Sequence, residues 1–260
     1  MSNRLKWYDS VWLNKYLAAK EMISRLAPAR LPEFVDSFKV LRTDPNFAVT
    51  DVPNLFSAAQ LAAIKKTIEA IPKHTLEMHE IKSFGRFVVH NNPTFTQMQR
   101  ELVEMVSGLV GEEVEPSYNF LSLYTRMGIC EPHLDAPSAK WTLDVCIDQS
   151  QPWPIHLSQI VPWPEERLEL DDDWQTAIKQ ASHLRFQSKV LTPGSGIVFS
   201  GSSQWHYRDA LPSASKTAFC DLLFLHYIPK GTADIVTPRN WAQMFGIPEL
   251  ATIPGIDEAS

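Results

Sequence analysis

The spacing of the apolar residues changes at Gly111, and this change constrains the fold more than any other feature of the sequence. Before Gly111, apolar residues recur three or four positions apart over three stretches, which is typical of amphipathic helices. After Gly111, short β-rich runs alternate with Pro, Gly, Ser and Asp, which indicates strands joined by turns. Helices followed by strands, without βαβ alternation, favour an antiparallel sheet packed against helices or folded over itself. We therefore predict an α+β, mainly β fold with a double-stranded β-helix (jelly-roll) core and N-terminal helices packed against it.

Three helices are predicted before Gly111, over residues 8–26, 57–71 and 95–110. A stretch containing prolines, residues 27–32, ends the first helix. Ser57 can cap the second helix while Gln60 reaches back to the backbone, which is the capping-box pattern. Thr94 and Gln97 form the corresponding pair before the third helix.

The predicted strands cover residues 86–90, 118–124, 141–147, 155–160, 184–191, 197–200 and 217–227. A chain of 260 residues is an ordinary length for one β-rich domain. We assign a single domain, 1–260, in which residues 1–112 are a largely helical N-terminal support, 113–230 the jelly-roll core and 231–260 a C-terminal cap or tail. Residues 240–245 could form a short amphipathic helix that caps the core or joins two copies in a homodimer, and the sequence leaves both open.

Charge and hydrophobicity exclude several classes of partner. The net charge is −6 and the 24 basic residues are scattered, so the basic patch of a nucleic-acid-binding protein is missing. No apolar run approaches the roughly 20 residues that span a bilayer, and the first residues lack a signal-peptide core. The 3 cysteines lack the paired spacing of a structural zinc site. We expect a cytoplasmic protein with reduced thiols and no nucleic-acid or membrane partner.

Three residues have the chemistry of a metal site. His133 and Asp135 follow a predicted strand and are two positions apart, so in extended backbone both project from one face. His206 follows a second strand-like run further along the chain. Two imidazoles and one carboxylate can form a facial triad, which binds one side of an octahedral iron(II) and leaves the other positions open. We predict that His133, Asp135 and His206 are the metal ligands and the catalytic centre.

A cation lies where it could hold the far carboxylate of a co-substrate. Lys216 follows His206 at the start of the predicted strand over residues 217–227. Arg208, two residues beyond His206, could point into the same cavity on extended backbone, and its planar guanidinium suits carboxylates. The sequence ranks Lys216 ahead of Arg208 for this task.

The segment 123–135 resembles the Tyr-x-x-x-Gly and Pro-His-x-Asp motifs of the prolyl-hydroxylase-like branch of the 2-oxoglutarate- and iron(II)-dependent oxygenases. The motif positions here are Tyr124, Gly128 and Pro132 to Asp135. His206 and Lys216 keep the family's spacing between the distal histidine and its Lys or Arg. The turn over residues 192–196 resembles the family's Pro-x-x-Gly turn. The resemblance covers roughly residues 118–229.

This resemblance implies an enzyme that uses Fe(II), 2-oxoglutarate and O2 and releases succinate and CO2. It implies a dioxygenase that hydroxylates an unactivated C–H bond, with iron on His133, Asp135 and His206. It also implies that Lys216, helped by the hydroxyl of Tyr124, binds 2-oxoglutarate. The sequence departs from many family members at Cys130, near a position that is usually aromatic, and in the long loop between the two ligand motifs.

The substrate is expected to be a small molecule or an amino-acid residue. Arg126 and Arg208 could anchor a carboxylate on it, Asp144 could contact it from the strand over 141–147, and Trp205 lies beside His206. Two other functions stay open. The same triad could hold zinc in a hydrolase or isomerase, which would not need Lys216, or the chain could be a non-catalytic jelly-roll binding module.

Overall fold

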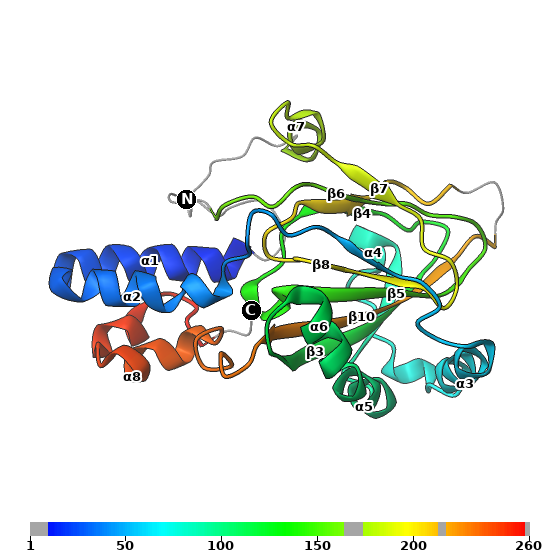
Figure 1. Cartoon of the computed structure of the whole chain (residues 1–260), viewed down its shortest axis with the longest axis horizontal. Helices are drawn as coiled ribbons and strands as arrows, with labels where there is room; N and C mark the ends of the chain where they lie inside the picture. Colours follow the sequence, from blue (N-terminus) through cyan, green and yellow to red (C-terminus); the bar gives the residue numbers. More distant parts are fainter. Residues whose placement is uncertain (1–9, 164–173, 213–216, 258–260) are drawn as a thin grey trace.

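Two antiparallel sheets form the centre of the protein (Figure 1). The computed structural model describes residues 10–163, 174–212 and 217–257. The six-stranded sheet has the order β1 (Thr50–Val52), β8 (Gly196–Phe199), β5 (Trp141–Gln149), β10 (Cys220–Pro229), β3 (Val114–Tyr124) and β2 (Arg86–His90). The four-stranded sheet has the order β4 (Cys130–His133), β9 (His206–Arg208), β6 (Ile155–Leu157) and β7 (Gln187–Lys189).

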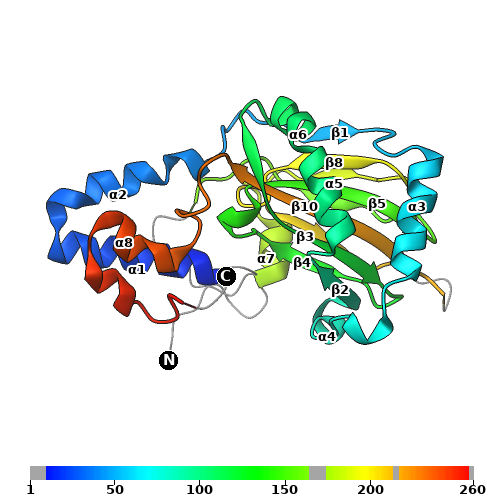
Figure 2. The ribbon, with the colours of Figure 1, turned by 90° about the horizontal axis from the view of Figure 1, so that it is seen from below.

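Three helices cover the outer face of the six-stranded sheet (Figure 2). They are α3 (Ala58–Glu69), α5 (Pro93–Glu101) and α6 (Val103–Val110). Their buried residues Ile64, Phe95 and Val106 pack against alternate residues of the central strands, such as Leu143 and Leu223. Two further helices lie beside the sheets, α4 (Ile81–Phe84) before β2 and α7 (Trp174–Gln180), which contacts β4.

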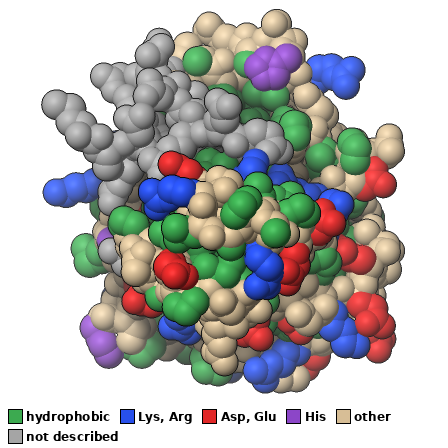
Figure 3. All heavy atoms as spheres, turned by 90° about the vertical axis from the view of Figure 1, so that its left-hand side faces the viewer, with side chains coloured by type: hydrophobic (Ala, Val, Ile, Leu, Met, Phe, Trp, Pro, Cys, Tyr) green, Lys and Arg blue, Asp and Glu red, His purple; other side chains and the backbone are tan. Residues whose placement is uncertain are grey.

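A separate helical lobe extends from one end of the sheets (Figure 1). It consists of α1 (Ser10–Leu26), α2 (Leu31–Ser37) and residues 231–257, which include α8 (Trp241–Phe245). Aromatic rings from both ends of the chain fill this lobe. The ring centroids of Trp12 and Trp241 lie 5.5 Å apart, and those of Tyr16 and Phe38 lie 4.9 Å apart. On the end of the molecule seen in Figure 3, acidic and basic side chains are interspersed with hydrophobic ones. The first predicted helix therefore packs mainly with the C-terminal segment rather than on the sheet.

The helix prediction is confirmed for α1 and α3, and wrong in detail for the third helix. Ser57 and Gln60 form the predicted capping box. The third helix is divided at Leu102 into α5 and α6, and its cap is Asn92, whose side chain accepts from the Thr94 N–H. Pro93 explains this shift, because proline is favoured in the first turn of a helix. Helix α2 was not predicted, because it is short and begins at the end of the stretch, residues 27–32, that was read as a helix stop.

Strands β4 and β9 were also missed, although they carry the predicted metal ligands. Each is short, and hydrophobic periodicity identifies such short strands poorly. The long strands were predicted well, with β3, β5 and β10 matching within a few residues. Among the described residues, no helix is both long and apolar enough to cross a membrane.

Candidate metal centre

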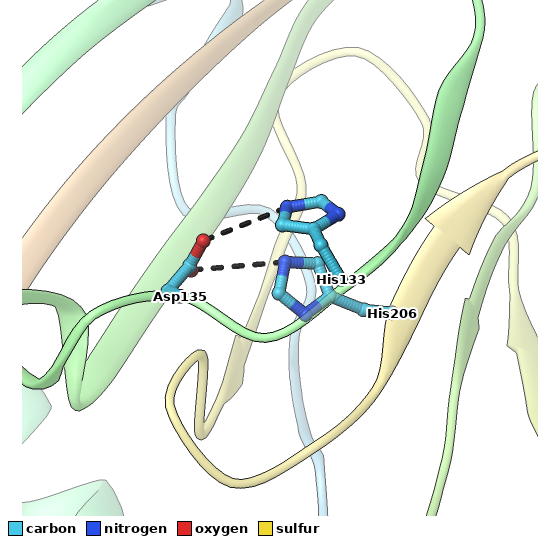
Figure 4. A group of neighbouring side chains, drawn as sticks. All are labelled: His133, Asp135 and His206. Carbon is cyan, nitrogen blue, oxygen red and sulfur yellow. Dashed lines mark ion pairs between the residues drawn. The ribbon is translucent and has the colours of Figure 1, made fainter. Parts of the chain in front are cut away.

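The structure brings together the three residues predicted as metal ligands (Figure 4). His133 ends β4, His206 begins β9, and the two are register partners on adjacent antiparallel strands. Asp135 follows β4 after one intervening residue. The sheet pairing therefore aligns two imidazoles side by side, with ring centroids 4.1 Å apart, and the turn after β4 adds the carboxylate.

The donor atoms of the three side chains converge on one point. His133 Nε2 lies 3.5 Å from Asp135 Oδ1, and His206 Nε2 lies 3.7 Å from Asp135 Oδ2. One ligand atom from each residue lies within 4.8 Å of the others. Two nitrogens and one oxygen are a donor set that suits iron(II) with open positions.

Backbone carbonyls orient both imidazoles. His133 Nδ1 lies 2.7 Å from the carbonyl oxygen of Glu131, and His206 Nδ1 lies 2.9 Å from that of Gln204. A carbonyl only accepts, so each Nδ1 carries a proton, and each Nε2, which faces Asp135, is the nitrogen left to bind a metal ion. Such second contacts raise the ligand strength of a histidine and hold its ring in place.

Gly201 leaves the space that the carboxylate occupies. The Asp135 N–H donates to the Gly201 carbonyl at 2.9 Å. A Cβ at position 201 would lie 2.3 Å from Asp135 Oδ2, 2.6 Å from the Ala139 carbonyl oxygen and 2.8 Å from Thr142 Oγ1. Any larger residue at this position would push the carboxylate from its place.

Burial sets the charge state of the site. It raises the pKa of Asp135 and lowers the pKa of His206 well below its usual range. For His133, burial opposes protonation, but the neighbouring Cys130 and Asp135 raise its pKa to about 9. A buried carboxylate between two imidazoles is stabilised by a cation, so the three residues fit a divalent metal ion.

The triad lines a cavity of 610 Å³ that lies between the two sheets. The cavity wall includes the charged or phenolic side chains Arg86, Tyr124 and Arg208, and a group of rings from β3 and β10. Apolar residues such as Phe199 and Ile155 complete it. This volume is in the range of small-molecule sites.

Arg208, one of the three residues predicted to bind the co-substrate, lines this cavity. It is buried, and its guanidinium donates to Asp144 Oδ2 at 2.7 Å and to the Trp153 carbonyl at 2.5 Å. An arginine has five N–H donors, so these contacts leave donors for a ligand carboxylate. Burial raises the pKa of Asp144 while Arg208 lowers it.

Tyr124 is buried in the same wall, where its hydroxyl lies 2.7 Å from Arg86 Nη1. Arg86 also donates to Glu80 and is itself buried. Sequence reasoning missed Arg86 and Glu80. The available signal was a charged residue at the start of the predicted strand 86–90, since a buried arginine in a sheet needs a partner.

The other predicted site residues lie away from the cavity or outside the described residues. Lys216 falls outside the described part of the chain. Arg126 is exposed in the turn after β3, and it is absent from the cavity wall. Asp144 is fully buried behind Arg208. Trp205 packs in a cluster with Leu134, Trp174 and Leu184, outside the wall of the cavity.

No protein-family model matches the chain, and no curated protein sequence matches it. Solved structures resemble its fold. SnoK, a non-heme alpha-ketoglutarate-dependent carbocyclase from nogalamycin biosynthesis, has a TM-score of 0.56 at 9% identity, covering 76% of this chain and 88% of that one. HygX from Streptomyces hygroscopicus, with nickel, 2-oxoglutarate and hygromycin B bound, has a TM-score of 0.52 at 9% identity, covering 76% and 86%. EctD from S. alaskensis, with 2-oxoglutarate and 5-hydroxyectoine, has a TM-score of 0.51 at 14% identity, covering 73% and 80%. At these identities the likeness is one of fold.

Proposed function

We propose that this protein is an iron(II)- and 2-oxoglutarate-dependent dioxygenase that hydroxylates a C–H bond of a small molecule or an amino-acid residue. The convergence of His133, Asp135 and His206 at the wall of the cavity carries this proposal. The motifs around Tyr124 and His133 support the prolyl-hydroxylase-like branch of these oxygenases.

The strand order supports a jelly-roll core. Along the chain from β3 to β10, strands pass from one sheet to the other, and β3, β5, β8 and β10 form the centre of the six-stranded sheet. Strands β4, β6, β7 and β9 form the whole four-stranded sheet. A double sheet of eight strands is the arrangement expected for a jelly roll, which supports this part of the proposal. Solved structures of similar fold include proteins with 2-oxoglutarate bound, which is consistent with the same chemistry here.

In this proposal the chain binds and orients the reacting groups. His133, Asp135 and His206 would hold the iron through Nε2, a carboxylate oxygen and Nε2. When bound, iron(II) and 2-oxoglutarate would supply the oxidation, which consumes dioxygen and releases succinate and CO2. The enclosing sheets would keep bulk water from the reaction.

Arg208 and Tyr124 are the described residues best placed to hold the distal carboxylate of 2-oxoglutarate. Arg208 retains free N–H donors beside its contact with Asp144. The Tyr124 hydroxyl is held by Arg86, which leaves its other side for a ligand. Lys216 is the third candidate anchor, from its place in the sequence.

An anaerobic titration tests the proposal. Metal-free protein is mixed with iron(II) and then with 2-oxoglutarate, and the weak visible charge-transfer band of the chelate is recorded. We expect the band in the wild type and in the exposed control His74→Ala, and its loss in His206→Ala. Absence of the band in the wild type, together with tight zinc binding, would exclude the oxygenase and favour a zinc hydrolase on the same triad.

Two variants decide between the anchors. If Lys216 binds the co-substrate, Lys216→Ala should raise the apparent Michaelis constant for 2-oxoglutarate. If the Arg208 guanidinium binds it instead, Arg208→Lys should raise this constant. We expect the larger rise for Arg208→Lys, because an ammonium cannot keep Asp144, Trp153 and a ligand carboxylate bound at once.

A further inference from the structure

Four rings on neighbouring strands form one wall of the cavity, which we call the ring wall: Tyr118 and Phe120 on β3, and Phe224 and His226 on β10. Phe120 and Phe224 are register partners, with ring centroids 4.8 Å apart and planes inclined by 27°. His226 is stacked 4.3 Å from Tyr118 and 5.4 Å from Phe120.

The ring wall keeps part of its aromatic surface exposed, although His90 and Arg86 lie against Phe120. Phe120 and Phe224 are only half-buried, whereas Leu223 and Leu225, which alternate with them on β10, are fully buried under the helices. Aromatic faces prefer an offset ring as a neighbour. A flat ring in the cavity would give Phe120 and Phe224 that neighbour.

One polar atom of the ring wall has no hydrogen-bond partner among the residues that the structure describes. His226 is 2% exposed, its Nδ1 lies 3.0 Å from Thr142 Oγ1, and its Nε2 makes no hydrogen bond within this part of the chain. Among the described residues, the other buried side-chain atoms without a partner belong to residues outside the cavity wall. Burial, with His90 and Arg86, lowers the pKa of His226 to about 3. A neutral buried imidazole with an unpaired nitrogen is costly unless a ligand group pairs with it.

The ring wall adjoins the metal centre through Thr142. The space that a Cβ of Gly201 would fill is bounded by Asp135 Oδ2 on one side and Thr142 Oγ1 on another. Thr142 in turn contacts His226. His206 and His226 both line the cavity. A molecule on the ring wall would therefore lie beside the triad.

We propose that the primary substrate is a compound with a flat unsaturated ring and a hydroxyl group. The ring stacks on Phe120 and Phe224, and the hydroxyl pairs with His226 Nε2. That the bound compound is a substrate rests on the proposed oxygenase function. Its binding to the ring wall can be measured without turnover.

Equilibrium dialysis with three matched probes tests this inference. The probes are 2-naphthol, naphthalene, which lacks the hydroxyl, and 2-decalol, whose rings are saturated. We expect the full-length protein to bind 2-naphthol about tenfold more tightly than either other probe, because each of them loses one of the two contacts.

Two variants assign the contacts. His226→Phe keeps a ring in the stack but removes the nitrogen, so 2-naphthol should bind no better than naphthalene. Phe224→Leu should weaken the binding of 2-naphthol and of naphthalene and leave the binding of 2-decalol unchanged. The matched controls are His74→Phe, at an exposed position, and Phe47→Leu, whose ring packs on Trp141 outside the cavity. Thermal unfolding of each variant verifies that it is folded.

The outcomes separate this inference from the proposed function. Equal binding of the three probes, no binding of 2-naphthol, or wild-type affinity in both variants would refute the ring wall as a substrate site. The dialysis is repeated with anaerobic iron(II) and 2-oxoglutarate. If the chelate band is missing but the pattern of probe affinities persists, the oxygenase proposal fails while the aromatic ligand site stands.

Discussion

The two faces of the six-stranded sheet differ, although they are made by the same strands. On β5, Leu143 and Val145 point to the helices and are fully buried among apolar neighbours. On the same strand, Thr142 and Asp144 point to the other side, where they contact His226 and Arg208. The outer face supplies hydrophobic stabilisation, whereas on the inner face Thr142 pairs with His226 and Asp144 pairs with Arg208, which lowers the cost of burying these groups.

The comparison predicts the largest loss of stability on the inner face, at the buried ion pair. Asp144→Asn leaves the Arg208 guanidinium charged and without its carboxylate, so the free energy of unfolding should fall by about 3–5 kcal/mol. Urea unfolding followed by tryptophan fluorescence measures it. The double variant Asp144→Leu/Arg208→Met should recover most of this loss while it weakens 2-oxoglutarate binding. If Asp144→Asn is as stable as the wild type, the pair is not a structural requirement of the inner face.

On the outer face, a core truncation should affect stability alone. Leu143→Ala removes apolar volume from beneath the helices, and the free energy of unfolding should fall by about 2–5 kcal/mol. The folded protein should keep its iron affinity, because Leu143 does not contact the triad or the cavity. Urea unfolding and the anaerobic iron titration measure the two quantities. A large loss of iron affinity would show that the two faces are coupled.

Alanine substitutions of two glycines, one at the metal centre and one in a helix on the outer face, should have different effects. Gly201→Ala places a methyl group against Asp135, so iron affinity should fall about 10- to 100-fold, as for other losses of support around a ligand. Gly108→Ala, at an exposed position of α6 with no atom within 4 Å of the added Cβ, should stabilise the protein by about 0.5–1 kcal/mol. Metal titration and thermal unfolding compare the two. Unchanged iron affinity in Gly201→Ala would contradict the close approach of Asp135 to residue 201.

A similarly small effect concerns the pH dependence of stability. The pKa of His226 is about 3 in the folded protein and about 6.5 when unfolded, so below pH 6.5 the unfolded chain binds a proton that the folded one does not. Stability is therefore lost as the pH falls. His226→Phe should reduce the loss between pH 6 and pH 5 by about 1 kcal/mol. Urea unfolding at both pH values measures it, with His74→Phe as control; identical slopes in wild type and His226→Phe would argue against a neutral buried His226.

Prediction from the sequence succeeded where local chemistry decides the structure. The capping box at Ser57 and Gln60 depends on a short stretch of chain, and it was recovered. Long alternating strands were recovered for the same reason. The division of the third helix at Leu102 and the pairing of the first helix with the C-terminal segment were not, because both depend on packing between segments far apart in the chain.

The sequence by itself identified the three residues of the candidate metal centre, because an His-x-Asp pair and a distal histidine have a recognisable pattern. It also singled out Tyr124 and Arg208, which the structure places in the cavity wall. Only the tertiary structure decided that His133 and His206 are register partners, and that Arg208 is paired with Asp144. The ring wall likewise appeared only in the structure. Alternation along a strand shows which residues share a face, but the pairing of strands and the position of the second sheet decide which face encloses a cavity.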